Sequence, residues 1–179
     1  MNRQCGQSLH LVGRTAMGCS RPSINWWKPG RGCYRVFIFL LRNAMKANIK
    51  WLEEMQFVGQ SGTGHSVVLD SPDNGMGISP MEMLLLGLGG CTSFDVVSIL
   101  KKARQKIEDC RVEVDADRAE EPPRVFTSIR IHYTVSGYEL NENQVHRAIE
   151  LSRTKFCGAS IMMEKSGAEM KHSVEIIQL

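Results

Sequence analysis

The stretch LLLGLGGCTSFDVVSIL, residues 84–100, is apolar on every side of a helix, yet it places Gly87, Gly89 and Gly90 just before Cys91. Each glycine inside a helix costs about 1 kcal/mol relative to alanine, so something else must favour glycine here. An apolar surface all round a helix indicates that the helix is buried on every side. The glycines therefore predict the close approach of another backbone, such as a second copy of the same helix, beside the cysteine.

A capping signature marks the beginning of this helix, which we expect to run from Pro80 to about Lys106. Ser79 fits the N-cap, proline fits the first helical position, and Glu82 follows the serine by three residues. A membrane span is the alternative for so apolar a helix. Glu82, Asp95 and the polar residues that follow interrupt the apolar length, which favours a core helix and no membrane partner.

Alternation of polar and apolar residues predicts strands on both sides of the long helix. The expected order is three strands, the long helix, two strands, two shorter helices and a final strand. This order is typical of an α+β fold, here with antiparallel sheets around a long buried central helix. The strands are expected within 47–70 and at 110–118, 125–135 and 170–179, and the shorter helices at 141–153 and from Cys157 onward.

The balance of basic and acidic residues changes near Met45. Seven of the 22 basic residues and none of the 19 acidic ones precede Met45. We expect residues 1–44 to be a non-globular extension, either translated from a start codon assigned too early or acting as a basic targeting segment, and residues 45–179 to form the domain. The domain is net acidic, which argues against nucleic-acid binding. Few cysteines and no zinc-type spacing indicate a reducing, cytoplasmic environment and no metal.

The cysteines are the candidate reactive groups of the domain. Cys91 shares a helix face with Asp95, whereas Cys157 lies at an expected helix start, where the helix dipole favours a thiolate, close to Arg153 in sequence. Buried cysteine is more often a small hydrophobic core residue, and this is the interpretation that we prefer for Cys110. A reactive thiol beside a second, resolving thiol is what two-electron oxidant chemistry requires.

The segments PMEMLLLGLGGCTSFDVVSIL (80–100) and KFCGASIMMEK (155–165) resemble the OsmC/Ohr family of thiol-dependent hydroperoxide reductases, in particular its YhfA-like branch. The resemblance implies an OsmC-like fold and an intertwined homodimer, with two central helices packed together and active sites at the subunit interface. It also implies that Cys91 attacks the peroxide and becomes a sulfenic acid, which Cys157 resolves as a disulfide. An external dithiol would then restore both thiols, without a bound cofactor.

The sequence departs from this pattern at the group that activates the thiol. The hydroperoxidase branches place a glutamate directly after the proline that opens the helix, where it holds an arginine against the thiol. Here Met81 follows Pro80, so the acid is Glu82, about 100° further round the helix. Residues 45–79, where that arginine is expected, contain none. The expected site is Cys91, Cys157 and Glu82, with Asp95 and Arg153 as orienting groups and Met81 and Met83 lining an apolar pocket.

Two functions follow from these residues. The first is reduction of organic hydroperoxides by a cytoplasmic homodimer through Cys91 and Cys157. Without a nearby cation, however, burial raises the pKa of a thiol and leaves it less reactive. The second function is therefore a catalytically silent dimer that binds a small apolar ligand in its interface pocket.

Overall fold

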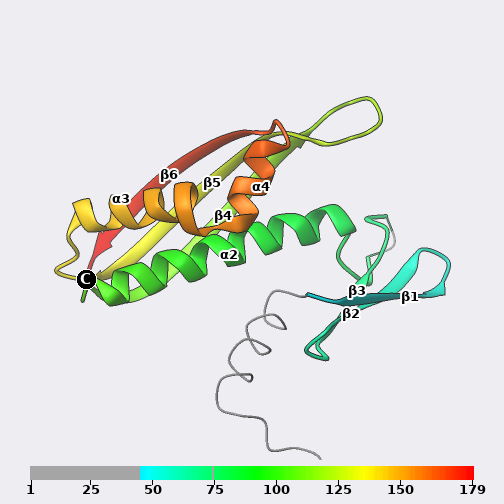
Figure 1. The fold of residues 1–179 in the computed structure, drawn as a ribbon, viewed down its shortest axis with the longest axis horizontal. Coiled ribbons are helices and arrows are strands. Elements are labelled where there is room, and N and C mark those ends of the chain that lie inside the picture. The colour runs from blue at the N-terminus through cyan, green and yellow to red at the C-terminus, as the bar shows by residue number, and fades with distance from the viewer. Residues whose placement is uncertain (1–44, 74) are drawn as a thin grey trace, which may run out of the picture. The chain divides into compact units, whose positions relative to one another are not determined.

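The computed structural model describes residues 45–73 and 75–179, so the predictions for residues 1–44 lie outside the described residues. Residues 46–179 form one compact unit. It begins with β1 (Ala47–Glu53), β2 (Gln56–Ser61) and β3 (Ser66–Leu69), which pair antiparallel in the order β1-β2-β3. Figure 1 shows this first sheet beside the N-terminal end of the long helix α2 (Pro80–Lys102).

The second sheet has the order β4-β5-β6, from β4 (Lys106–Arg118), β5 (Phe126–Tyr138) and β6 (Glu169–Gln178). The α+β class and the order of elements are as the sequence predicts. β4 and β5 pair antiparallel, but β5 and β6 pair parallel, so the expectation of purely antiparallel sheets is wrong at this edge. Between β5 and β6 the chain runs back through helices, and such a crossover makes the next strand parallel.

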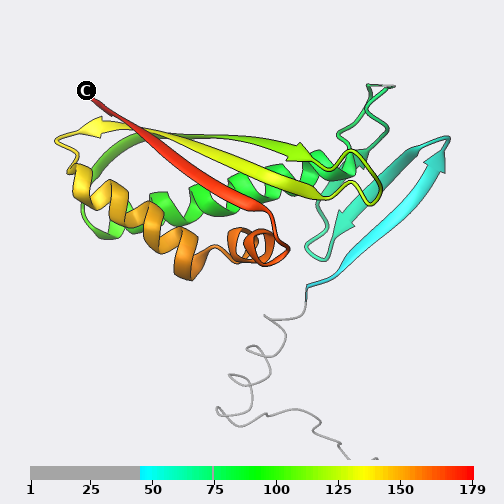
Figure 2. The ribbon, with the colours of Figure 1, turned by 90° about the horizontal axis from the view of Figure 1, so that it is seen from above.

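Helices cover one face of the second sheet (Figures 1 and 2). They are α2, α3 (Glu142–Leu151), a short π-helix η1 (Ser152–Phe156) and α4 (Gly158–Lys165). The sequence predicts one helix as far as Arg153, but α3 ends at Leu151, and the wider π turn follows. The core between the two layers includes these fully or almost fully buried residues of α2 and β5: Leu88, Val96, Leu100, Ile129, Ile131, Tyr133 and Val135.

The beginning of α2 is as predicted, and its end is not. The Glu82 N–H donates to Ser79 Oγ (3.3 Å), and the Ser79 N–H donates to Glu82 Oε2 (2.8 Å), which completes the capping box. The helix ends at Lys102, four residues before the predicted end. Arg104 adopts a positive φ of 58°, and the Gln105 N–H donates to the Leu100 carbonyl (3.0 Å). This is a Schellman ending without its usual glycine, which explains why the sequence did not indicate it.

α2 is buried on one side only within the described chain. Leu88 and Val96 are fully buried, whereas Leu86 is 62% and Phe94 77% exposed. The expectation of burial on every side is therefore wrong for a single copy of the chain. α2 is long and apolar enough to cross a membrane, but its buried residues pack in the core of the domain.

The glycines of α2 have different surroundings. A Cβ built on Gly89 would lie 3.2 Å from Val114 Cγ2 on β4, so this glycine lets the helix approach the sheet closely. A Cβ at Gly87 or Gly90 would meet nothing within 4 Å. The close approach of α2 to β4 therefore explains Gly89. For Gly87 and Gly90 the close approach of a second copy of the helix stays a prediction.

Candidate functional site

The structure brings Cys91, Cys157 and Asp95 together. The two Sγ atoms and a carboxylate oxygen of Asp95 all lie within 4.8 Å of one another. Cys91 and Asp95 are separated by one turn on α2, which places both side chains on one helix face. Cys157 comes from a segment more distant in sequence, where it is the N-cap of α4. Both cysteines are free thiols.

The π turn η1 fixes the position of Cys157. The Cys157 N–H donates to the carbonyl of Ser152 (2.8 Å), five residues earlier, and this bond closes the turn. The Cys157 sulfur in turn accepts from the Ser160 N–H (3.4 Å) in the first turn of α4. The Cys157 side chain is fully buried. These two hydrogen bonds hold its sulfur in place near Cys91.

The surroundings of Cys91 favour the protonated thiol. Burial raises its pKa, and hydrogen bonding to Cys157 and the negative charge of Asp95 act in the same direction, against a smaller opposing contribution from the Ala159 backbone amide. No lysine or arginine contributes among the described residues. This agrees with the absence of an arginine from residues 45–79.

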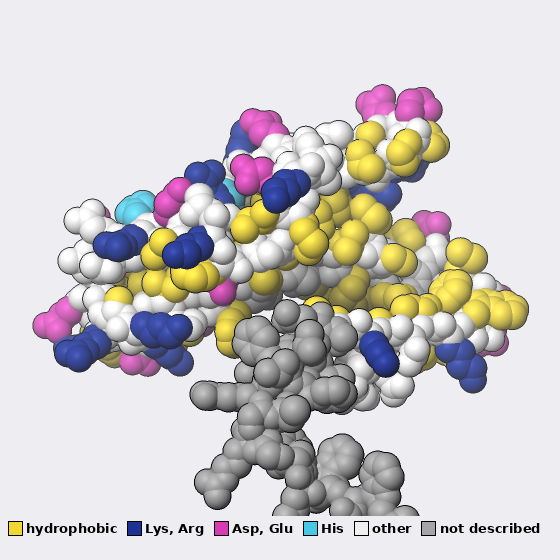
Figure 3. Space-filling model, viewed as in Figure 1, with side chains coloured by type: hydrophobic (Ala, Val, Ile, Leu, Met, Phe, Trp, Pro, Cys, Tyr) yellow, Lys and Arg dark blue, Asp and Glu magenta, His cyan; other side chains and the backbone are white. Residues whose placement is uncertain are grey.

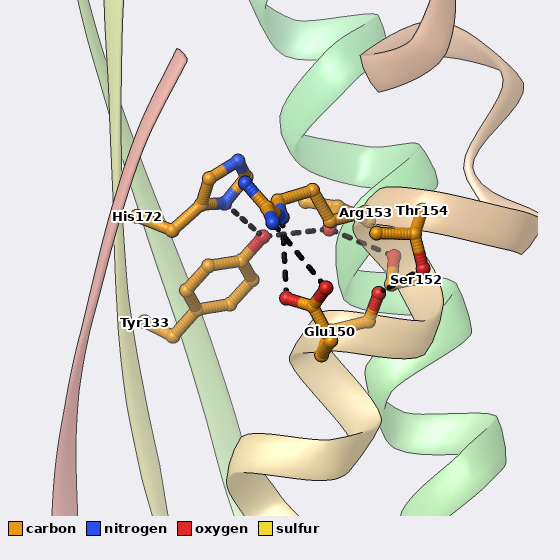
Figure 4. A network of polar contacts seen from close by, with 7 residues as sticks. Tyr133, Glu150, Ser152, Arg153, Thr154 and His172 are labelled. Carbon is orange, nitrogen blue, oxygen red and sulfur yellow. Dashed lines mark hydrogen bonds and ion pairs between the residues drawn. The ribbon is translucent and has the colours of Figure 1, made fainter.

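A chain of hydrogen bonds leads away from Asp95, and Figure 4 shows its part between Ser152, Tyr133 and His172. Ser152 Oγ donates to Asp95 Oδ2 (3.3 Å) and is hydrogen-bonded to Thr92 Oγ1 (3.1 Å). Thr92 is bonded to the hydroxyl of Tyr133 (2.8 Å), which is 3.3 Å from Nδ1 of His172. Burial raises the pKa of Tyr133 to about 12 and lowers the pKa of His172. Both rings are therefore neutral near pH 7, and the chain fixes the carboxylate of Asp95.

The other predicted site residues lie outside the two-thiol cluster. The carboxylate of Glu82, which we expected to be catalytic, is exposed and accepts a hydrogen bond from the backbone N–H of Ser79, the N-cap of α2. Arg153 pairs with Glu150 (Nε to Oε2, 3.3 Å) rather than with Asp95, as Figure 4 shows. Met81 packs against the core and Met83 is half-buried. Roles for these residues in the reaction stay predictions.

Cavities lie along α2 and beside Arg153, and one of them borders the two-thiol cluster at Asp95. One of about 740 Å³ lies along the exposed face of the helix, and a smaller one of about 180 Å³ includes Asp95 and Phe156 in its lining. A third, of about 410 Å³, is lined by Arg153 and His172 among others. The large cavity is lined by Gly90, Ser93, Phe94, Val97, Ser98, Lys101 and Lys102.

The supporting residues Thr92, Ser152 and Tyr133 were not predicted as part of the site from the sequence. All three are fully buried polar residues at core-facing positions. A buried polar side chain requires a partner, so their place in the apolar pattern was the available signal. The pattern alone does not say which of them bond to one another.

Comparison with known proteins places this cluster in a family. The family model described as OsmC-like protein matches residues 72–173, which include both cysteines and Asp95. The chain is also 43% identical to protein YhfA of Escherichia coli (strain K12) over 133 residues, 74% of this chain and 98% of YhfA. The chain belongs to the OsmC-like family. The sequence resemblance is confirmed.

Solved structures of other proteins share the fold. A crystal structure of a protein from Aquifex aeolicus VF5 is 28% identical, with a TM-score of 0.68 over 75% of this chain and 96% of that one. The organic hydroperoxide resistance protein OsmC from Legionella pneumophila is 16% identical, with a TM-score of 0.58 over 74% of this chain and 96% of that one. At that identity the likeness shows the fold alone.

Proposed function

We propose that this OsmC-like protein reduces organic hydroperoxides in the cytoplasm, with Cys91 as the nucleophile and Cys157 as the resolving thiol. The observation that carries the proposal is the meeting of two free thiols and a carboxylate within 4.8 Å. The thiols come from segments far apart in sequence, and a chain of hydrogen bonds fixes the carboxylate beside them. The substrate class is proposed by analogy with the Legionella pneumophila organic hydroperoxide resistance protein, whose fold this chain shares.

The proposed reaction balances without a bound cofactor. The Cys91 thiolate attacks one peroxide oxygen, an S–O bond forms as the O–O bond breaks, and the alkoxide takes up the thiol proton and leaves as an alcohol. Asp95 is close enough to accept the proton when the Cys91 thiol ionises and to return it to the alkoxide. Cys157 then attacks the sulfenic sulfur, water leaves, and a disulfide remains. An external dithiol reduces this disulfide by exchange.

Treatment of the reduced protein with an organic hydroperoxide is expected to form a Cys91–Cys157 disulfide in near-stoichiometric yield. The reason is that the two sulfur atoms already lie within 4.8 Å, so closing the bond requires only a small movement. Peptide mapping by mass spectrometry, with and without a reducing agent, measures the yield.

Cys110 is the internal control for this experiment. It is a free, half-buried cysteine on β4 and is not part of the two-thiol cluster. It should stay reduced at the peroxide concentration that oxidises the pair. Reduced Cys91 and Cys157 after prolonged treatment, or oxidation of Cys110 at the same rate, would contradict the proposal.

We further propose that the active form is a homodimer built on the exposed face of α2. Figure 3 shows hydrophobic side chains gathered around α4 and the adjoining part of α2, and the exposed ones in these helices include Leu86, Phe94 and Met162. Gly87 and Gly90 leave open space beside them, which a second copy of the helix can fill.

Replacing Phe94 by glutamate is expected to convert the dimer to a monomer at micromolar concentration, because it places a charge in the centre of the apolar face. Light scattering after size-exclusion chromatography measures the mass. Tyr138→Glu is the matched control, since Tyr138 is an exposed aromatic residue at the end of β5, away from this face. A wild-type monomer, or a Phe94→Glu dimer, would contradict the proposed interface.

One observation favours a second function, the binding of a small apolar ligand without catalysis. The surroundings of Cys91 raise its pKa, and no described cation opposes this. The cavity of about 740 Å³ on α2 is lined largely by apolar groups and is large enough for such a ligand. Reduced thiols after peroxide treatment, together with saturable binding of a fatty-acid probe, would support this second function over the first.

A further inference from the structure

We propose that Cys91, Cys157 and Asp95 form a binding site for a thiophilic divalent cation such as Zn²⁺ or Cd²⁺, occupied when both thiols are reduced. Their ligand atoms all lie within 4.8 Å of one another. Thiolate sulfurs select soft or borderline metals over Mg²⁺ and Ca²⁺, and the carboxylate oxygen supplies a third ligand of a type that zinc also accepts. The proposal stands on this geometry and does not require peroxide chemistry.

The dimensions of the cluster fit a tetrahedral metal after a small contraction. Zinc binds thiolate sulfur at about 2.3 Å and carboxylate oxygen at about 2.0–2.2 Å. Two sulfurs on one tetrahedral zinc are therefore about 3.8 Å apart. Atoms now at most 4.8 Å apart reach that spacing if each moves by about half an ångström, which rotation of the three side chains supplies.

Two further contacts hold the ligands in place. Ser152 Oγ donates to Asp95 Oδ2 (3.3 Å), and the Ser160 N–H donates to the Cys157 sulfur (3.4 Å). Hydrogen bonds of this kind orient the ligands of protein metal sites and are part of their affinity. Here they are supplied by the backbone of α4 and by the buried chain that ends at His172.

Charge at the cluster favours a cation. With both thiols bound as thiolates the three groups carry three negative charges, and in the described part of the chain Asp95 forms no ion pair. A divalent ion neutralises most of this charge. A cavity of about 180 Å³ includes Asp95 in its lining and offers the ion a route to the carboxylate.

A bound cation would hold the lone pairs of both sulfurs and so block attack on a peroxide. This consequence alone rests on the proposed function. It makes the reduced site a switch between a metal-bound, protected state and a metal-free, reactive state. Conversely, a Cys91–Cys157 disulfide offers no thiolate to the metal.

Anaerobic titration of the reduced full-length protein with Co²⁺ tests the site, since cobalt bound to thiolates gives a charge-transfer absorption band. Cys5, Cys19 and Cys33 are first replaced by serine, so that the three cysteines of the described domain remain. We expect one Co²⁺ per chain, displaced by Zn²⁺ and Cd²⁺. Cys110→Ser, the matched control, should leave the band unchanged.

The ligand variants decide the outcome. Cys91→Ser and Cys157→Ser should each abolish the thiolate band, Asp95→Asn should weaken the affinity at least tenfold, and Ser152→Ala should weaken it about tenfold. Circular dichroism verifies that each variant is folded. A band that survives either cysteine substitution, or an affinity that Asp95→Asn leaves unchanged, overturns the three-ligand site. Because the readout is absorption rather than turnover, it is independent of whether the protein reduces peroxides.

Discussion

The substitution Cys91→Ser is expected to lower the rate of organic hydroperoxide consumption to the uncatalysed background, a loss of roughly 10³-fold or more. The serine hydroxyl occupies almost the same volume as the thiol, so the half-buried position on α2 should tolerate it. A hydroxyl cannot replace a thiolate as nucleophile toward the O–O bond, because it is far less acidic. Consumption of cumene hydroperoxide, followed with an excess of dithiol, measures the rate.

Two matched variants separate the roles of the cysteines. Cys157→Ser should retain a single turnover, leaving a sulfenic acid at Cys91 that a sulfenate-trapping reagent captures. Cys110→Ser should turn over at the wild-type rate, since it lies on β4 outside the cluster. A Cys157→Ser variant that traps no sulfenic acid, or a Cys91→Ser variant that still consumes peroxide, would show that Cys91 is not the nucleophile.

The sequence predicts the elements of this fold well where the signal is local. The capping box of Ser79 and Glu82 marks the start of α2, and alternation along β4 and β5 identifies both strands. Each of these features depends on residues only a few positions apart. The end of α2 is equally local, but Arg104 takes the position that glycine normally occupies, so the sequence carried no sign of it.

The assembly of the site could not be predicted in the same way. The local pattern says that Cys91 lies on a helix and that Cys157 begins one, but the contact between them depends on how α4 packs against α2. The π turn of η1, which positions Cys157, has no reliable sequence signature. The two cysteines were paired in advance only through resemblance to a family. Arg153 shows how far proximity in sequence can mislead. It is close to Cys157 along the chain and was therefore expected to orient the site, but in the structure it forms an ion pair with Glu150.

The sequence already shows that residues 45–79 contain no arginine, and this absence affects the pKa of Cys91. Partial burial, with a carboxylate beside the thiol and no described cation, raises the pKa of Cys91. The same surroundings that disfavour a thiolate in the free protein favour a cation at the cluster. In the metal site that we propose, the ion would neutralise most of the negative charge of these three groups.

A second large effect is expected in stability, from Leu88→Ala on α2. Leu88 is fully buried against the second sheet, and replacing such a leucine leaves a cavity that costs about 2–5 kcal/mol of the free energy of unfolding. Urea denaturation followed by circular dichroism measures the change. A loss below about 1 kcal/mol would contradict the placement of Leu88 in the core.

Leu86→Ala is the matched control, because it removes the same atoms two residues earlier on the same helix. Leu86 is 62% exposed in the single chain, so its loss should change the free energy of unfolding by no more than about 0.5 kcal/mol if the chain is a monomer. If a second copy covers this face, Leu86→Ala should instead destabilise the protein in a concentration-dependent way, since the folded state is then linked to association. The Leu88→Ala loss should persist at every concentration. The pair of variants therefore distinguishes burial within one chain from burial between two, and shows which of them accounts for the fully apolar surface of α2.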